Sequence, residues 1–209
     1  MGSSQRKSIL FLTNSEHGQA NIHFATAFEF LERDDIDVHI ASYPSVGTRV
    51  EELNKRIQSH RQKTSFGQAV SQTKATFHAL GGVCMVDNLR EKNLIWPHKT
   101  GIRNVTRGFK EMAKIVIRDD HRSYLRDYDD IVALIKDLNP AVAAIDPMLY
   151  SAIDACNEMD LKYVILSPMT FYELAASVQP RAQIFWKYPV LVPSPNLTSS
   201  KAHIQSKTS

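Results

Sequence analysis

The sequence predicts an α/β fold with a Rossmann-like, doubly wound parallel sheet. Two observations support this fold class. Short apolar runs, of the kind that form strands buried on both faces, alternate with longer segments that have helical periodicity. The order strand, turn, helix, strand also occurs twice, once near the N-terminus and once after residue 140, and that order is typical of parallel strands joined by helical crossovers.

The first of these units begins with the run "SILFLT" at Ser8–Thr13, which is predicted to be a buried strand. A polar turn with a single glycine then leads into an amphipathic helix at Ala20–Leu31, and Val38–Tyr43 is the next strand. The expected inward face of this helix is formed by Ile22, Ala25, Phe28 and Leu31.

The later elements continue this alternation. Further strands are expected at Ala75–Leu80, Val142–Ile145 and Tyr163–Ser167, and further helices at Val50–Gln62, Gly101–Arg118, Arg122–Leu138 and Ser151–Met159. Beyond about Val178 the apolar period is lost and prolines appear. We therefore expect a Rossmann-like domain at residues 7–178 and a linker-like or disordered tail at residues 179–209.

Composition excludes several classes of function. The net charge of +3, without a basic block, argues against a nucleic-acid partner. Cys84 and Cys156 match no zinc or redox spacing and are expected to be buried thiols. Asp119–Arg122 is expected to form charge pairs on a solvated face rather than a metal site. No run approaches the roughly 20 apolar residues of a membrane helix, and the polar start lacks a signal region, so we expect a cytoplasmic protein.

Ligands of open parallel sheets bind outside the carboxyl ends of the strands. Three turns are expected there: Thr13–Gln19, the turn at Asp146, and Ser167–Thr170. The first turn has Gly18 as its only glycine and no Gly-Lys-Ser/Thr ending, so it is a poor phosphate cradle. An independent nucleotide-binding domain is therefore disfavoured.

Three side chains at these turns are candidates for chemistry. Asp146 directly follows a buried strand, where a carboxylate is costly unless it pairs or serves a purpose. The alternative for Asp146 is that it caps the following helix. His17 could accept a proton near neutral pH or be an ordinary exposed loop residue, and His23 could face the crevice or belong to a packed surface.

Two segments together resemble the N-terminal half of family 1 UDP-glycosyltransferases, most closely the fungal members. They are "ILFLTNSEHGQANIHFATAFEFL" at the start and "NPAVAAIDPMLYSAIDACNEMDLKYVILSPMT" at residues 139–170, and the match covers about residues 7–190. The resemblance implies the acceptor-binding domain of a GT-B enzyme. In that family a histidine of the first turn removes the acceptor's hydroxyl proton, an aspartate after a later strand orients it, and the sugar is transferred with inversion.

Carried over by residue, the resemblance makes Asp146 the aspartate and His17 the candidate base. Many members have Gly-His where this chain has Gly18-Gln19, and a glutamine amide does not titrate near neutral pH. His17 and His23 are therefore alternatives for the base, and a missing base is the third possibility. The residues expected to line the acceptor site are Ser15, Gly18, Gln19, His23, Pro147, Met148 and Pro168.

The resemblance also sets expectations about partners. The family's UDP-sugar signature lies in its C-terminal half, which this sequence lacks, so we expect no bound cofactor, UDP-sugar as co-substrate of the complete enzyme, and a separate donor-binding domain or subunit. The acceptor is expected to be a small, apolar, hydroxylated molecule, and the isolated chain is expected to be inactive. The competing hypothesis is a catalytically inactive small-molecule binding module.

Overall fold

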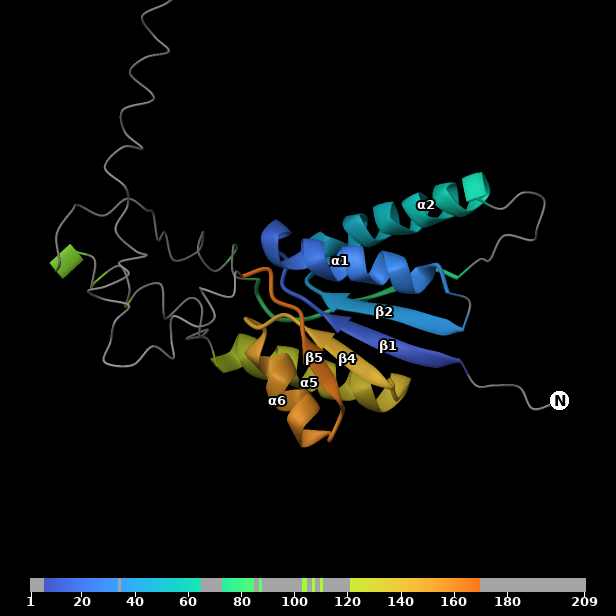
Figure 1. Cartoon of the computed structure of the whole chain (residues 1–209). Coiled ribbons are helices and arrows are strands. Elements are labelled where there is room, and N and C mark those ends of the chain that lie inside the picture. Colours follow the sequence, from blue (N-terminus) through green and yellow to red (C-terminus); the bar gives the residue numbers. More distant parts are fainter. Residues whose placement is uncertain are drawn as a thin grey trace, which may run out of the picture. The chain divides into compact units, whose positions relative to one another are not determined.

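The described part of the computed structural model centres on a parallel sheet of five strands in the order β3-β2-β1-β4-β5 (Figure 1). It comprises residues 6–33, 35–64, 73–84 and 121–169, with the separate positions 87, 103, 104, 107 and 110. The strands are β1 (Lys7–Leu12), β2 (Ile36–Ser42), β3 (Thr76–Ala79), β4 (Val142–Ile145) and β5 (Tyr163–Ile165). The predicted doubly wound fold is confirmed. The helix expected at Gly101–Arg118 falls almost wholly outside the described residues, and the tail at 179–209 lies entirely outside them.

Helices cover both faces of the sheet (Figure 1). On one face lie α1 (His17–Leu31) and α2 (Gly47–Thr64), which follows the short 3-10 turn η1 (Pro44–Val46). On the other face lie α5 (His121–Leu138) and α6 (Tyr150–Glu158). The central strand explains why: Ile9 and Phe11 pack toward α1 and α2, whereas Leu10 and Leu12 pack in the core that α5 and α6 cover. A strand apolar on both sides needs a helix layer on each.

The inward face of α1 differs from the prediction. The buried stripe consists of Ala20, His23, Ala27 and Leu31. Ala25 is exposed, while Ile22 and Phe28 are only partly buried. The prediction followed the larger apolar side chains, but alanines face the sheet, where small residues let the helix approach closely. The helix also begins at His17, three residues before the predicted start, so His17 lies in its first turn.

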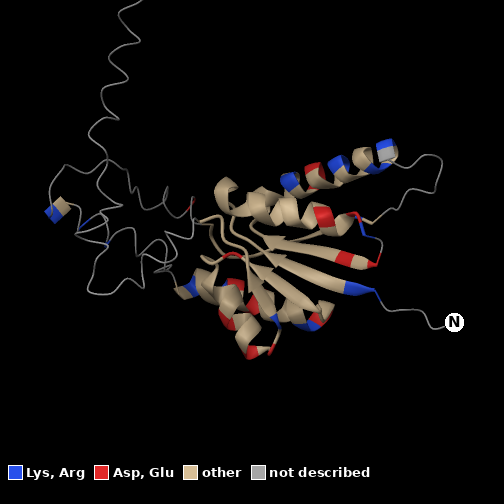
Figure 2. Cartoon of the chain, in the orientation of Figure 1, with Lys and Arg blue, Asp and Glu red and all other residues tan. Residues whose placement is uncertain are grey.

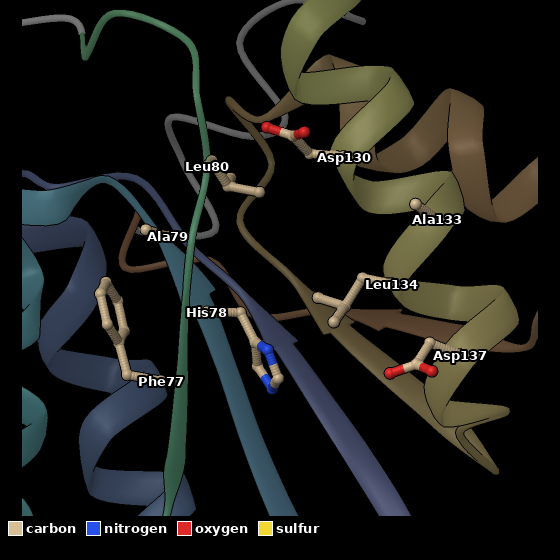
Figure 3. Close-up of a pocket in the computed structure, with 8 residues that line it drawn as sticks. All are labelled: Phe77, His78, Ala79, Leu80, Asp130, Ala133, Leu134 and Asp137. Atoms are coloured by element: carbon tan, nitrogen blue, oxygen red, sulfur yellow. The ribbon is translucent and has the colours of Figure 1, made fainter.

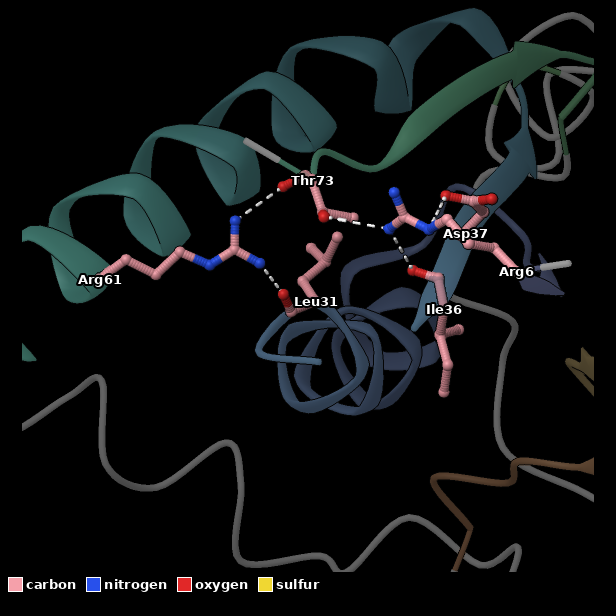
Figure 4. Close-up of polar contacts among 6 residues, drawn as sticks. All are labelled: Arg6, Leu31, Ile36, Asp37, Arg61 and Thr73. Atoms are coloured by element: carbon pink, nitrogen blue, oxygen red, sulfur yellow. Dashed lines mark hydrogen bonds and ion pairs between the residues drawn. The ribbon is translucent and has the colours of Figure 1, made fainter. Parts of the chain in front are cut away.

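Two arginines join the helix layer to the edge of the sheet (Figure 4). The Arg61 guanidinium, on α2, is buried and donates to the carbonyl oxygens of Leu31 and Thr73. Leu31 is the last residue of α1, and carbonyl groups at a helix C-terminus lack partners within the helix. Arg6 pairs with Asp37 at 3.2 Å and donates to Thr73 Oγ1 at 3.1 Å. Together they hold the chain before β3 against both β2 and α1.

The loop after β3 is held by side chains of α5. The Asp127 carboxylate is fully buried and accepts a hydrogen bond from the Tyr43 hydroxyl at 2.7 Å and from the Gly82 N–H at 3.0 Å. Ser123 Oγ accepts from the Val83 N–H at 2.7 Å. A Cβ atom at Gly82 would lie 2.3 Å from an oxygen of Asp127, so this position requires glycine.

We expect Gly82→Ala to lower the free energy of unfolding by about 2–4 kcal/mol, because the added methyl group displaces the buried carboxylate of Asp127, which accepts two hydrogen bonds. Chemical denaturation of the purified chain measures this. Gly18→Ala is the matched control, since a Cβ there meets no atom within 4 Å and the residue lies in a helix. Equal stability of the two variants would contradict the role assigned to Gly82.

Candidate active site at the carboxyl edge of the sheet

The turns after β1 and β4 lie side by side because these two strands are neighbours in the sheet. Leu12 is paired with Ile145 at the carboxyl ends of the two strands. The chain runs outward from β1 through β2 to β3 on one side, and the other side is built from β4 and β5. The boundary between β1 and β4 is therefore the point at which strand order reverses, where ligands of this fold class bind.

Asp146 connects these two turns. Its carboxylate is fully buried, and Oδ2 accepts from the backbone N–H of Asn14 at 3.2 Å and from the side-chain amide of Asn14 at 3.3 Å. Oδ1 accepts from the Met148 N–H at 2.9 Å. These bonds show that the turns after β1 and β4, both expected at the carboxyl edge of the sheet, meet there. The helix-capping alternative is wrong, because α6 begins at Tyr150 and its N-cap position, Leu149, makes no side-chain capping bond.

Asn14 is the site residue that the sequence reasoning missed. It is 4% exposed and supplies two of the donors that the Asp146 carboxylate needs. A polar residue two positions beyond a buried strand was the available signal, but its partner is 132 residues away in sequence. The pairing follows only once β1 and β4 are known to be neighbours.

Gln19 reaches toward the turn after β4. Its side-chain amide contacts the Met148 sulfur at 3.5 Å. Its Oε1 is buried and has no hydrogen-bond partner among the described residues. The hydroxyl of Ser151, in the first turn of α6, is also buried and has no hydrogen-bond partner among the described residues. Buried polar atoms are normally hydrogen-bonded, so these two retain the capacity to bind a ligand.

The two histidines of α1 point to different surroundings. His17 is exposed and lies at the start of the helix, where it lines a groove between α1 and α2. His23 is 1% exposed and packs edge-on against Phe11, with ring centroids 6.2 Å apart. Burial lowers the pKa of His23 to about 4, an effect that the nearby backbone of Leu166 opposes. Among the described residues, no hydrogen bond joins either imidazole to Asp146.

The remaining predicted site residues lie around this edge. Ser15 is partly buried and donates to Glu16 at 3.4 Å, and Gly18 is exposed. Pro147 and Met148 are partly buried, and Pro168 is exposed in the turn after β5. That turn belongs to the same edge, because β5 pairs with β4 and the Leu166 N–H donates to the Ile145 carbonyl at 2.9 Å.

A separate hollow of about 500 Å³ lies between β3 and α5 (Figure 3). His78 and Asp137 contribute to its lining from opposite sides. His78 Nε2 lies 3.1 Å from His39 Nδ1, so one ring donates a hydrogen bond to the other, and burial lowers the pKa of both rings. Within the described ranges, no three His, Cys, Asp or Glu side chains are grouped so as to hold a metal ion. In the same ranges, no helix is both long and apolar enough to span a membrane.

The chain is similar in sequence to a known glycosyltransferase. No protein-family model matches the chain. It is 29% identical over 194 residues to the glycosyltransferase sdnJ of Sordaria araneosa, an alignment that covers 89% of this chain and 36% of that protein. The chain is therefore similar to a glycosyltransferase and spans little more than a third of that relative's length.

Solved glycosyltransferases share the fold. The chain superposes on VinC, in complex with dTDP, with a TM-score of 0.51 at 11% identity, over 90% of this chain and 40% of that one. It superposes on CalG4, the calicheamicin glycosyltransferase, with a TM-score of 0.51 at 13% identity, over 86% and 39% of the two chains. At these identities the likeness concerns the fold. The described domain has the Rossmann-like α/β architecture found in these glycosyltransferases.

Burial of His23 should make stability depend on pH. Its pKa is lowered from an ordinary 6.5 to about 4, so the unfolded chain binds a proton in this interval that the folded chain does not. The free energy of unfolding should therefore fall as pH drops from about 6.5 to about 4, by about 3 kcal/mol at most. Urea denaturation at a series of pH values measures this slope.

His23→Leu should reduce the slope in that interval, since leucine does not titrate, and should leave the part that the lowered pKa values of His39 and His78 contribute. His121→Gln is the control, because His121 is exposed and its loss should leave the slope as it was. An undiminished slope in His23→Leu would show that the burial of His23 does not cause it.

Proposed function

We propose that this chain is the acceptor-binding domain of a glycosyltransferase that transfers a sugar from a UDP-sugar to a hydroxyl of a small apolar acceptor, with inversion. The observation that carries the proposal is Asp146: a fully buried carboxylate at the strand-order switch point, held by the turn after β1. The similarity to sdnJ and the shared fold support the reaction class.

The proposed base is His17. It is exposed at the start of α1, next to the turn that Asp146 holds, so an acceptor hydroxyl can reach it. His23 is a poorer candidate, because its ring is sealed in the core and its pKa is lowered to about 4. Gln19 cannot serve, because its amide does not titrate near neutral pH.

In the proposed reaction, His17 takes the proton of the acceptor hydroxyl as the oxygen forms a bond to the anomeric carbon. The bond from that carbon to UDP breaks, and UDP leaves with the electron pair. The charge of Asp146 would stabilise the imidazolium that forms through its electric field, because no hydrogen bond joins the two side chains among the described residues. The acceptor site would be lined by the turns that contain Ser15, Gly18, Gln19, Pro147, Met148 and Pro168.

The described domain offers no phosphate loop for the donor. The first turn lacks the glycines and lysine of a phosphate loop. VinC, whose structure holds dTDP, is matched over only 40% of its length. We therefore propose that a further domain or subunit binds the nucleotide-sugar, with UDP as the nucleotide on the strength of the sequence resemblance.

The test is a chimera in which this chain is joined to the part of sdnJ that it does not match, assayed with UDP-glucose and a panel of phenols, sterols and polyketides. We expect the chimera to transfer sugar and the chain alone not to. His17→Gln should lower kcat by about 10²–10⁴-fold, which is the contribution typical of a general base. Asp146→Asn should lower kcat by a comparable factor.

His23→Gln is the matched control and should leave kcat nearly unchanged. Full activity of His17→Gln would overturn its assignment as the base. Robust transfer by the isolated chain would overturn the need for a separate donor domain. Tight binding of acceptors without transfer by any chimera would instead favour a binding module.

A further inference from the structure

A groove of about 590 Å³ runs between α1 and α2, the helices that lie side by side on one face of the sheet (Figure 1). Its apolar lining comes from Phe24, Phe28 and Leu53. Arg49 and Arg56 line it from α2. This volume is within the range of about 300–1,000 Å³ that is usual for small-molecule sites, and it is too small for a partner helix.

Arg49 is the unusual residue of this groove. Its guanidinium lies 4.7 Å from the centre of the Phe24 ring, and Nη2 donates to Asn21 Oδ1 at 2.7 Å. Nη1, by contrast, is shielded from solvent and has no hydrogen-bond partner among the described residues. A buried donor without a hydrogen bond costs on the order of 1–3 kcal/mol of stability, and an acceptor supplied by a ligand would recover this free energy.

The charges around the groove favour an anion. Figure 2 shows that α1 is nearly free of charged side chains, whereas α2 carries both signs. Among the described residues, the lining of the groove includes two arginines, Arg49 and Arg56, one carboxylate, Glu52, and the imidazole of His17. Glu52 partly offsets the charge of Arg49, while desolvation lowers the pKa of the Arg49 guanidinium. A ligand with one negative charge fits this balance better than a phosphate dianion, which Glu52 would repel.

We propose that the groove between α1 and α2 binds a small molecule with an apolar, aromatic body and a single carboxylate. The body packs against Phe28 and Leu53, and the carboxylate accepts a charge-assisted hydrogen bond from Arg49 Nη1, which becomes accessible to the ligand when the guanidinium turns into the groove. This site shares His17 with the proposed function, because His17 lines the same groove, but it requires neither sugar transfer nor Asp146.

The test compares two probes of the same shape, 2-naphthoate and the neutral 2-naphthalenemethanol, titrated into the full chain. Amide shifts in NMR spectra locate the site, and calorimetry measures the affinity. We expect 2-naphthoate to bind at least about tenfold more tightly, as a charge-assisted hydrogen bond would give, with shifts concentrated on α1 and α2. Equal affinities, or shifts centred elsewhere, would overturn the proposal.

Variants separate the Arg49 contact from general attraction to a basic helix. Arg49→Gln should abolish the preference for the carboxylate, while Lys55→Gln, an exposed cation of α2 outside the groove lining, should preserve it. Glu52→Gln should tighten 2-naphthoate binding by about threefold, because it removes a like charge. Circular dichroism checks that each variant folds. If Arg49→Gln does not fold, the affinity of Glu52→Gln for 2-naphthoate is the deciding measurement. An undiminished preference in Arg49→Gln, or unchanged affinity in Glu52→Gln, would count against the site.

Discussion

The burial of β1 on both faces is the constraint on which the rest of this structure depends. Because Leu10 and Leu12 pack to one side and Ile9 and Phe11 to the other, the strand must lie inside the sheet with helices above and below it. With β1 at the centre, β2 and β4 become its neighbours, and the strand order must reverse between β1 and β4. The candidate site is thus a consequence of how the core is filled.

This arrangement allows the carboxylate of Asp146 to be buried. A carboxylate sealed from water is costly unless it is paired, and here Asn14 and Met148 supply the donors. The same bonds fix the turn after β1 in register with the turn after β4. A single buried charge therefore both joins two segments that are distant in sequence and keeps a negative charge beside the start of α1.

The two faces of α1 carry different kinds of side chain. The side facing the sheet uses Ala20 and Ala27 to approach closely, and it encloses His23 as a neutral ring. The side facing α2 carries Phe24 and Phe28, which remain partly exposed beside Arg49. Because the alanines occupy the position next to the sheet, the larger aromatic residues pack at the margin of the core and are only partly buried. The groove between the helices is the result, and His17 lies at the start of the same helix.

The sequence by itself predicted the fold class, the positions of the strands and Asp146 as a candidate site residue. Double burial leaves continuous apolar runs such as "SILFLT", and a carboxylate directly after such a run is visible without coordinates. Only the tertiary structure decided the partner of Asp146 and the directions of His17, Gln19 and His23. Asn14 and Asp146 meet through strand order, which no local pattern records. His17 is exposed and His23 is buried because of how α1 is rotated about its axis. That rotation places the alanines, rather than the larger apolar residues, against the sheet.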